Sequence, residues 1–117
     1  MLDKNVIAQL IADIGEDVFI RLSGQFLDET IDRLATLASC REREAWSDLA
    51  RHAHSLKSTA QSFGLPETGL LARDLQMAAD HLDIAAIDAI LPQLIRITDD
   101  ECREFIALRQ ELSVKSR

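Results

Sequence analysis

Residues 44–63 of the chain read EAWSDLARHAHSLKSTAQSF. Apolar residues recur in this stretch at alternating steps of three and four, a spacing that places their side chains along one face of an α-helix. The residues of this apolar face are Trp46, Leu49, Ala53, Leu56, Ala60 and Phe63. Gly64 follows directly and suits a left-handed C-terminal cap, while Pro66 suits the first turn of another helix. The stretch therefore predicts an amphipathic helix that ends at a sharp turn.

The same periodicity, interrupted by turn residues, extends in both directions from this stretch. Asp3 can cap a short first helix that runs to about residue 13, and Gly15 ends it. Long amphipathic helices are predicted over 16–41 and 66–82. Asp83 can cap a last helix that runs to about residue 112. The sequence therefore predicts one short helix followed by four long ones.

The periodicity also predicts which residues of these helices face the interior. In the 16–41 helix they are Ile20, Leu27, Ile31, Leu34 and Ala38; in the 66–82 helix they are Leu70, Leu71, Leu75, Ala78 and Ala79; in the last helix they are Ile87, Ile90 or Leu91, Leu94, Ile97 and Ile106. Pro92 lies inside the last helix, where its missing N–H and its clash with the preceding turn predict a kink.

The composition indicates an all-α fold. The 117 residues include only 4 Gly and 2 Pro and no Tyr, which favours helices over strands. A chain of this length suits one domain with one hydrophobic core. Long helices joined by short loops favour antiparallel neighbours. The expected fold is an antiparallel up-down-up-down four-helix bundle with a short N-terminal helix, formed by residues 1–117 as a single domain.

The charge of the chain argues against several classes of partner. Lys and Arg number 13 against 20 Asp and Glu, a net charge of −7 with no basic run, so nucleic acids and anionic membranes are not expected partners. No charge-free stretch approaches the about 20 apolar residues of a membrane span, and the N-terminus does not resemble a signal peptide. Cys40 and Cys102 lie far apart without metal-type spacing. We therefore expect a cytoplasmic protein with reduced thiols.

A second apolar stripe lies beside the first on the 16–41 helix. It consists of Phe19, Leu22 and Phe26. One interpretation is a wider buried face that the short N-terminal helix covers. The other is a partly exposed patch on which a partner protein docks. The sequence leaves both interpretations open.

One face of the 44–63 helix concentrates chemically useful side chains around His54. At 100° per residue, Lys57, Ser58 and Gln61 lie within about 60° of His54, and Arg51 lies about 60° away on the other side. The residues one and two turns before His54 are Ala50 and Ser47, both small. Small neighbours leave the imidazole ring accessible to a large group.

This combination suits phosphoryl transfer. A neutral imidazole is a nucleophile near neutral pH, and an adjacent lysine can stabilise the charge of a phosphoryl group. The chain has no GxxxxGK[ST] loop, no other glycine-rich phosphate cradle and no carboxylate cluster suited to magnesium. The site is therefore expected to accept and donate a phosphoryl group without obtaining one from ATP itself, as a phosphocarrier rather than an enzyme.

The run AHSLK at 53–57, followed by Gly64 ten residues after the histidine, resembles the histidine-containing phosphotransfer (Hpt) domain of multistep phosphorelays. The resemblance covers essentially the whole chain. It implies that His54 is phosphorylated and that Lys57 stabilises the charge. It also implies that Gln76, on the following helix, hydrogen-bonds the ring at Nδ1 and leaves Nε2 free.

One position departs from the family pattern. Ser58 stands where the family usually has a glycine that gives the incoming receiver domain room. Serine is small, and its hydroxyl can donate to a phosphoryl oxygen. Arg51 is expected to add positive potential, with Gln61 and Gly64 as supporting residues.

The resemblance further implies the partners. They are the receiver domain of a hybrid histidine kinase, which supplies the phosphoryl group from an aspartate, and the receiver domain of a response regulator, which accepts it. Magnesium would come from the receiver, so no cofactor or metal of the chain's own is expected, and a monomer is the expected form. The alternative is a docking or dimerisation module that binds such partners without phosphotransfer.

Other polar residues are expected to have no functional role. His52 and His81 are interpreted as solvated surface histidines, and His52 lies two residues from His54, a spacing that does not suit a helical pair of metal ligands. The acidic run at 99–101 is interpreted as a solvated face.

Overall fold

The computed structural model describes residues 1–115, of which residues 1–114 have described side chains, and all of its regular elements are helices. They are α1 (Lys4–Ile14), α2 (Glu16–Glu42), α3 (Trp46–Ser62), α4 (Pro66–Asp80) and α5 (Ile84–Lys115). The predicted all-α class and the order of one short and four longer helices are confirmed. The largest boundary difference is at the end of α5, three residues later than predicted; α3 begins two residues later and α4 ends two residues earlier than predicted.

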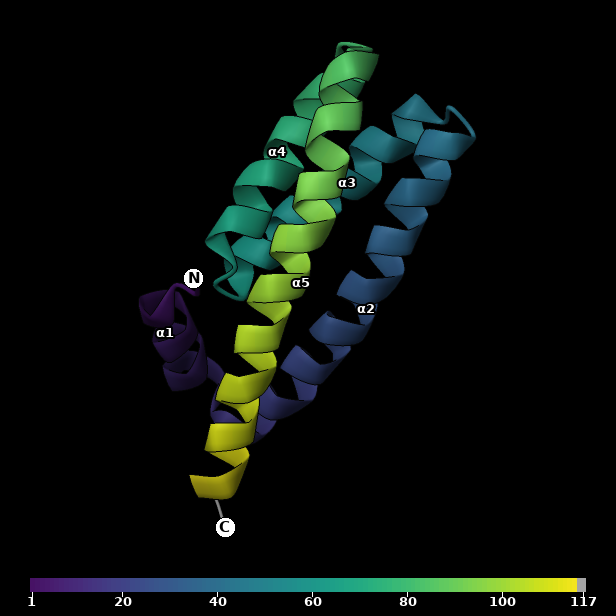
Figure 1. The fold of residues 1–117 in the computed structure, drawn as a ribbon. Coiled ribbons are helices and arrows are strands. Elements are labelled where there is room, and N and C mark those ends of the chain that lie inside the picture. Colours follow the sequence, from purple (N-terminus) through teal and green to yellow (C-terminus); the bar gives the residue numbers. More distant parts are fainter. Residues whose placement is uncertain (116–117) are drawn as a thin grey trace.

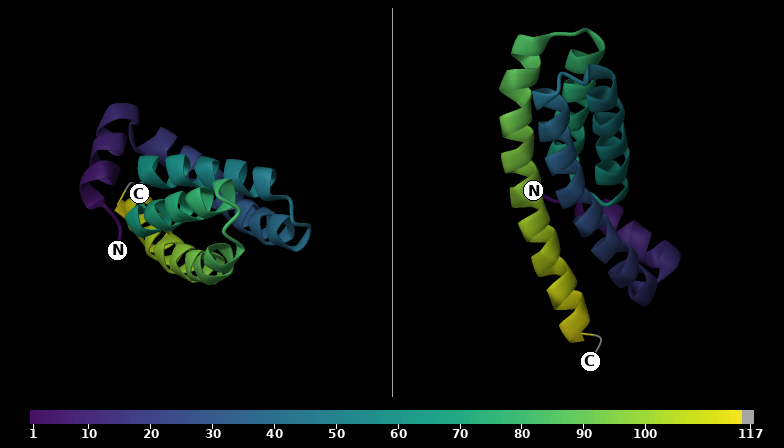
Figure 2. Two further views of the ribbon diagram at one scale, coloured as in Figure 1. Left: turned by 90° about the horizontal axis from the view of Figure 1, so that it is seen from above. Right: turned by 90° about the vertical axis from the view of Figure 1, so that its right-hand side faces the viewer.

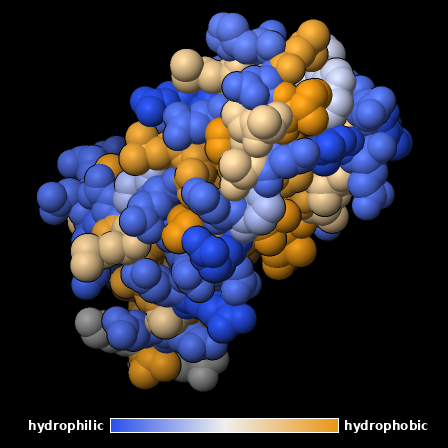
Figure 3. Space-filling view, turned by 45° about the horizontal axis from the view of Figure 1, so that its top comes forward, coloured by the Kyte–Doolittle hydropathy of each residue, from blue (hydrophilic) through white to orange (hydrophobic). Residues whose placement is uncertain are grey.

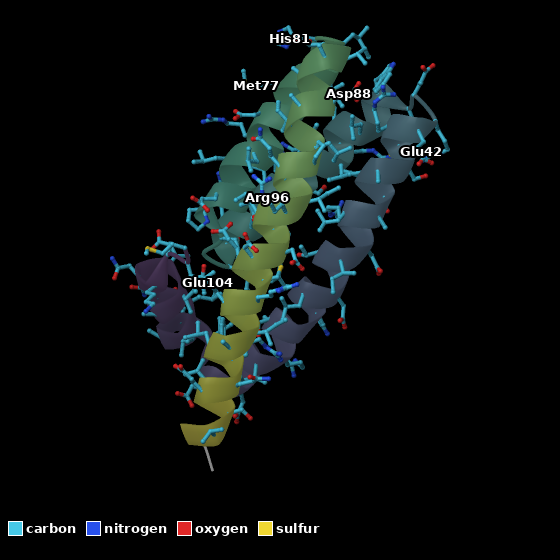
Figure 4. The ribbon with its side chains drawn as sticks, viewed as in Figure 1. Glu42, Met77, His81, Asp88, Arg96 and Glu104 are labelled. Carbon is cyan, nitrogen blue, oxygen red and sulfur yellow. The ribbon has the colours of Figure 1, made fainter. Side chains whose placement is uncertain are left out.

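Helices α2 to α5 form an antiparallel bundle in which each helix packs against the next and α5 returns against α2 (Figure 1). The body is elongated, 49 × 21 × 20 Å, because α5 and the first half of α2 extend past the ends of α3 and α4 (Figure 2). The short helix α1 packs against α2 at this extended end. At the opposite end, Asp88 of α5 (Figure 4) pairs with Arg41 of α2, whose Nη2 lies 3.1 Å from Asp88 Oδ2.

The predicted caps fix several of the helix ends. Asp3 accepts a hydrogen bond from the Val6 amide at 3.2 Å, and Asp83 accepts one from the Ala86 amide at 3.1 Å. Gly15 ends α1 with φ at 85°. Asp3 and Asp83 accept hydrogen bonds from first-turn amides that have no partner within the helix. Gly15 adopts a positive φ that other residues rarely adopt.

Gly64 serves two purposes, of which only one could be seen in the sequence. Its φ is 77°, the left-handed conformation expected of a residue that follows a helix. In addition, its carbonyl accepts a hydrogen bond from the Asp3 amide at 2.8 Å. A Cβ atom here would lie 2.8 Å from the Asp3 carbonyl oxygen and from Ile7 Cγ1. The absence of a side chain therefore lets the start of α1 dock against the α3–α4 turn.

The interior contains two groups of apolar residues. One lies among α2 to α5 towards the α2–α3 turn and includes Leu37, Leu49, Leu56, Leu75 and Leu94, all with 0% of their surface exposed. The other lies under α1 and includes Phe19, Phe26, Leu65 and Phe105, with the partly buried Phe63 stacked on Phe26 at 4.4 Å between ring centroids. The α1 helix thus seals an aromatic cluster at the extended end of the bundle.

The expectation that Phe19 and Phe26 form a docking patch is therefore wrong. Phe19 is 0% exposed and Phe26 is 3% exposed, because both pack against Phe105 within the second group. Leu22 is half-buried, so it alone of the three retains surface for a partner. The other interpretation, a wider buried face next to α1, describes this stripe correctly.

Three residues predicted to face the interior are exposed instead. They are Ile31, Leu70 and Ile106, with 63%, 52% and 40% of their surface exposed. In α2, Thr30 occupies the interior because its hydroxyl donates to the Phe26 carbonyl at 2.7 Å and so needs no water. In α5 the large Phe105 is buried next to Ile106. In both helices the residue one position earlier takes the interior place, while other members of the predicted stripes, such as Leu27 and Leu94, are buried as expected.

Pro92 does not interrupt α5, which continues as one helix through this residue. The proline itself is exposed. The exposed apolar residues on the side of the molecule seen in Figure 3 form separate groups among hydrophilic ones. Among the described residues, no helix is long and apolar enough to cross a membrane.

Glu101 is buried, so the expectation of a solvated acidic face at 99–101 is wrong for this residue. Only 1% of its surface is exposed. Its carboxylate accepts hydrogen bonds from the Thr68 amide at 2.7 Å and the Glu67 amide at 3.4 Å. These amides belong to the first turn of α4, where the helix offers unpaired N–H groups and a positive dipole. Glu101 of α5 therefore caps α4 from a neighbouring helix.

Candidate functional site

His54 lies in the middle of α3 with its side chain exposed, facing Gln76 of α4. The distance between His54 Nδ1 and Gln76 Oε1 is 3.2 Å. Because an amide oxygen can only accept, this contact requires the ring proton on Nδ1. The lone pair of the neutral ring is then on Nε2. The geometry thus presents a nucleophilic nitrogen on the surface.

A close approach of α3 and α4 holds this pair together. Gly69 of α4 lies against Gln61 of α3, where a Cβ atom would be only 3.2 Å from Gln61 Cγ. Small buried residues of the two helices, including Ala50, Ala53 and Ala72, also let the backbones approach. Gln61 therefore belongs to the helix contact, two turns away from His54.

A hollow of about 450 Å³ opens to solvent beside His54. Its lining residues are Ser47, Ala50, Arg51, His54, Ser55, Gln76 and Asp80. The small residues expected from the sequence, Ser47 and Ala50, do leave space next to the ring. The hollow is wide enough to admit a group from another protein.

The acidic member of this hollow, Asp80, was missed by the sequence analysis. Asp80 follows Gln76 by four residues, a spacing that places both on the same face of α4. This spacing was a usable signal once Gln76 had been singled out.

The two cations near His54 differ in how far their charge is compensated. Arg51 donates from Nη2 to Asp48 Oδ1 at 2.8 Å, an exposed pair within α3. Its positive potential is therefore smaller than the sequence suggested. Lys57 is half-buried and makes no ion pair and no side-chain hydrogen bond within the described residues. Lys57 thus supplies the uncompensated positive charge on this face.

The remaining supporting residues lie at different distances from the ring. Ser58 is exposed one turn after His54 on the same side of α3. Gly64 lies beyond the end of α3 and contacts Asp3 and Ile7, so its role is in the fold and not at the ring.

The other two histidines have partners of their own. His52 is half-buried, with Nδ1 3.0 Å from Arg33 Nη1 of α2, so its interpretation as a solvated histidine is wrong. Burial, together with the charges of Arg33 and Arg51, lowers the pKa of His52 below 6.5. His81 is exposed at the end of α4, and its Nδ1 donates to the Met77 carbonyl at 2.7 Å (Figure 4).

The described residues contain no group of three or more His, Cys, Asp or Glu side chains that could hold a metal ion. Cys40 is buried and Cys102 is partly buried, and both thiols are free.

The chain matches a known protein family. The model of the Hpt domain family matches residues 21–113, most of the chain and all of α3 and α4. The chain belongs to the Hpt domain family. Hpt domains are phosphocarriers of phosphorelays that interact with receiver domains, and they are not autonomous kinases. A search of curated proteins and a search of solved structures each returned no match.

Proposed function

We propose that this Hpt domain accepts a phosphoryl group on His54 from a receiver-domain aspartate and passes it reversibly to the aspartate of a response regulator. The observation that supports this most directly is the contact between His54 Nδ1 and Gln76 Oε1, because it leaves Nε2 as the exposed nucleophile. Family membership supports the same class of reaction.

In the accepting step, the Nε2 lone pair attacks the phosphorus of an aspartyl phosphate. An N–P bond forms, the bond between phosphorus and the aspartyl oxygen breaks, and the aspartate leaves as a carboxylate. The ring keeps its Nδ1 proton and becomes positively charged, and the Gln76 amide oxygen stabilises that charge. Donation to the next receiver reverses these changes.

Charge stabilisation is assigned to Lys57. Phosphoryl transfer depends chiefly on positioning and on cations that stabilise the charge of the phosphoryl oxygens. Lys57 is one turn from His54 and has no carboxylate partner in the described part of the chain. Arg51, which is paired with Asp48, contributes less.

The receiver domain would dock on the exposed faces of α3 and α4 around His54, with its reacting aspartate at the Nε2 edge of the ring. Magnesium would be bound by the acidic pocket of the receiver, and this chain would supply no metal ligand. A small interface is expected because a relay must release its partner. The proposed working form is a cytoplasmic monomer of one domain.

The experiment that tests this function mixes the purified protein with a phosphorylated receiver domain and magnesium. The expected result is a label on the Hpt domain that is stable in base and labile in acid. Loss of the label in His54→Gln and its retention in His81→Gln, a control at another exposed histidine, would locate it. Binding of receivers without any label would instead support a docking module that carries no phosphoryl group.

A further inference from the structure

The hydroxyl of Ser58 differs from the others in the body of α3. Beyond its first turn, this helix carries hydroxyls at Ser55, Ser58, Thr59 and Ser62. Three of them donate to the carbonyl four residues earlier: Ser55 to Arg51 at 3.2 Å, Thr59 to Ser55 at 3.1 Å and Ser62 to Ser58 at 3.0 Å. Ser58 makes no equivalent bond to the His54 carbonyl. Within the described residues its hydroxyl has no partner.

The position of Ser58 relates this free hydroxyl to the reacting ring. Ser58 is exposed and lies four residues after His54, on the same side of the helix. Side chains of an α-helix tilt towards its N-terminus, so the Ser58 side chain leans towards His54. Gln76 contacts the Nδ1 edge of the ring from α4, so that contact does not occupy the Nε2 edge.

We propose that Ser58 binds the phosphoryl group, its hydroxyl donating a hydrogen bond to a non-bridging oxygen of the phosphoryl group on His54 Nε2. This inference rests on the proposed phosphorylation of His54. A phosphoryl dianion carries two negative charges, whereas Lys57 supplies one positive charge. A neutral donor beside the lysine adds a directed contact. This contact has a low cost, because the Ser58 hydroxyl has no hydrogen bond to a backbone carbonyl that it would have to break.

The test charges the protein with phosphoramidate, a small donor that phosphorylates imidazoles without a partner protein. The ³¹P resonance of the phosphoryl group is then followed against pH, and the resonance that is absent in His54→Gln is assigned to this site. A hydrogen-bond donor favours the more highly charged form of its acceptor. The titration midpoint is therefore expected to shift to higher pH in Ser58→Ala and to keep the wild-type value in Ser58→Thr, which retains a hydroxyl.

Ser62→Ala is the matched control, because it removes an exposed hydroxyl that already bonds the backbone. Its midpoint is expected to equal that of the wild type. An unchanged midpoint in Ser58→Ala, or an equal shift in Ser62→Ala, would overturn the role of Ser58. If phosphoramidate charges His54 but no receiver does, the relay function fails while the Ser58 measurement still stands. If neither phosphoramidate nor a phosphorylated receiver charges His54, both proposals are overturned.

Discussion

Gln61 of α3 lies against Gly69 of α4 in the same antiparallel register that places His54 beside Gln76. His54 precedes Gln61 by seven residues, and Gln76 follows Gly69 by seven. The two contacts are therefore two turns apart along one helix pair. The separation of the backbones at Gly69 therefore also affects the distance between His54 and Gln76.

Replacing Gly69 by leucine is expected to force α3 and α4 apart. Overpacking of this kind lowers the free energy of unfolding by about 1–3 kcal/mol. Displacement of Gln76 from His54 is expected to slow phosphoryl transfer by about 10- to 100-fold. Urea unfolding and transfer from a phosphorylated receiver measure the two effects. Adding Gln61→Ala, which makes room for the new side chain, should recover part of both; no recovery would show that the contact at Gly69 does not set the spacing.

Replacing Gln76 by alanine is expected to release the ring proton from Nδ1. The tautomer with the proton on Nε2 then becomes populated, which is visible in the ¹⁵N spectrum of the labelled imidazole, and transfer slows by about 3- to 30-fold. Gln76→Glu keeps an acceptor oxygen at this position and should keep the Nδ1 proton. Identical tautomer populations in the wild type and Gln76→Ala would contradict the assigned role of Gln76.

His52 is expected to make stability depend on pH. Its pKa in the folded protein is lowered from 6.5 by burial and by Arg33 and Arg51, so below pH 6.5 the unfolded chain binds a proton that the folded chain does not. The free energy of unfolding should therefore fall as the pH drops from about 7.5 to about 5.5. In His52→Gln, which keeps an acceptor for Arg33, this slope should be smaller. An equal slope in both proteins would assign the pH dependence to other groups.

Loss of the Glu101 carboxylate is expected to destabilise the fold. Glu101→Ala leaves the first-turn amides of α4 without their buried acceptor, at a cost of about 1–3 kcal/mol in the free energy of unfolding. Asp100→Ala, at the exposed neighbouring position, should change stability by less than about 0.5 kcal/mol. Similar losses in the two variants would show that Glu101 has no special role in capping α4.

The Cys102 thiol is expected to be unreactive in the folded protein. Burial, with smaller effects from Asp99 and Glu101, raises its pKa to about 11, so very little thiolate exists at about pH 8. Iodoacetamide should label Cys102 slowly in buffer and rapidly in denaturing urea, with buried Cys40 following the same pattern. Fast labelling of the folded protein at Cys102 would contradict this. Stability should also fall above pH 9, because the unfolded thiol there loses a proton that the folded thiol keeps.

Much of this structure follows from local patterns in the sequence. The helices, the caps at Asp3 and Asp83 and the left-handed turn at Gly64 all depend on residues within a few positions of one another. Gln76 was placed opposite His54 from the family resemblance, and the structure brings the two together.

The features that the sequence did not predict depend on contacts between distant segments. Periodicity cannot tell that a residue of α5 caps α4, as Glu101 does, or that Arg33 of α2 reaches His52. It also cannot fix which way a helix with apolar residues on two sides is turned. For that reason the buried Phe19 and Phe26 could be mistaken for a surface patch.

His52 and His54 are two residues apart on α3, yet their Nδ1 atoms form opposite kinds of contact. Arg33 can only donate, so His52 uses its Nδ1 lone pair inside the protein and carries its proton on Nε2. Gln76 accepts through Oε1, so His54 has the reverse arrangement. Outside these contacts, His54 therefore has a basic nitrogen and His52 has an N–H. The partners from α2 and α4 thus make two identical side chains of one helix chemically different: His54 has a free basic nitrogen at Nε2, and His52 does not.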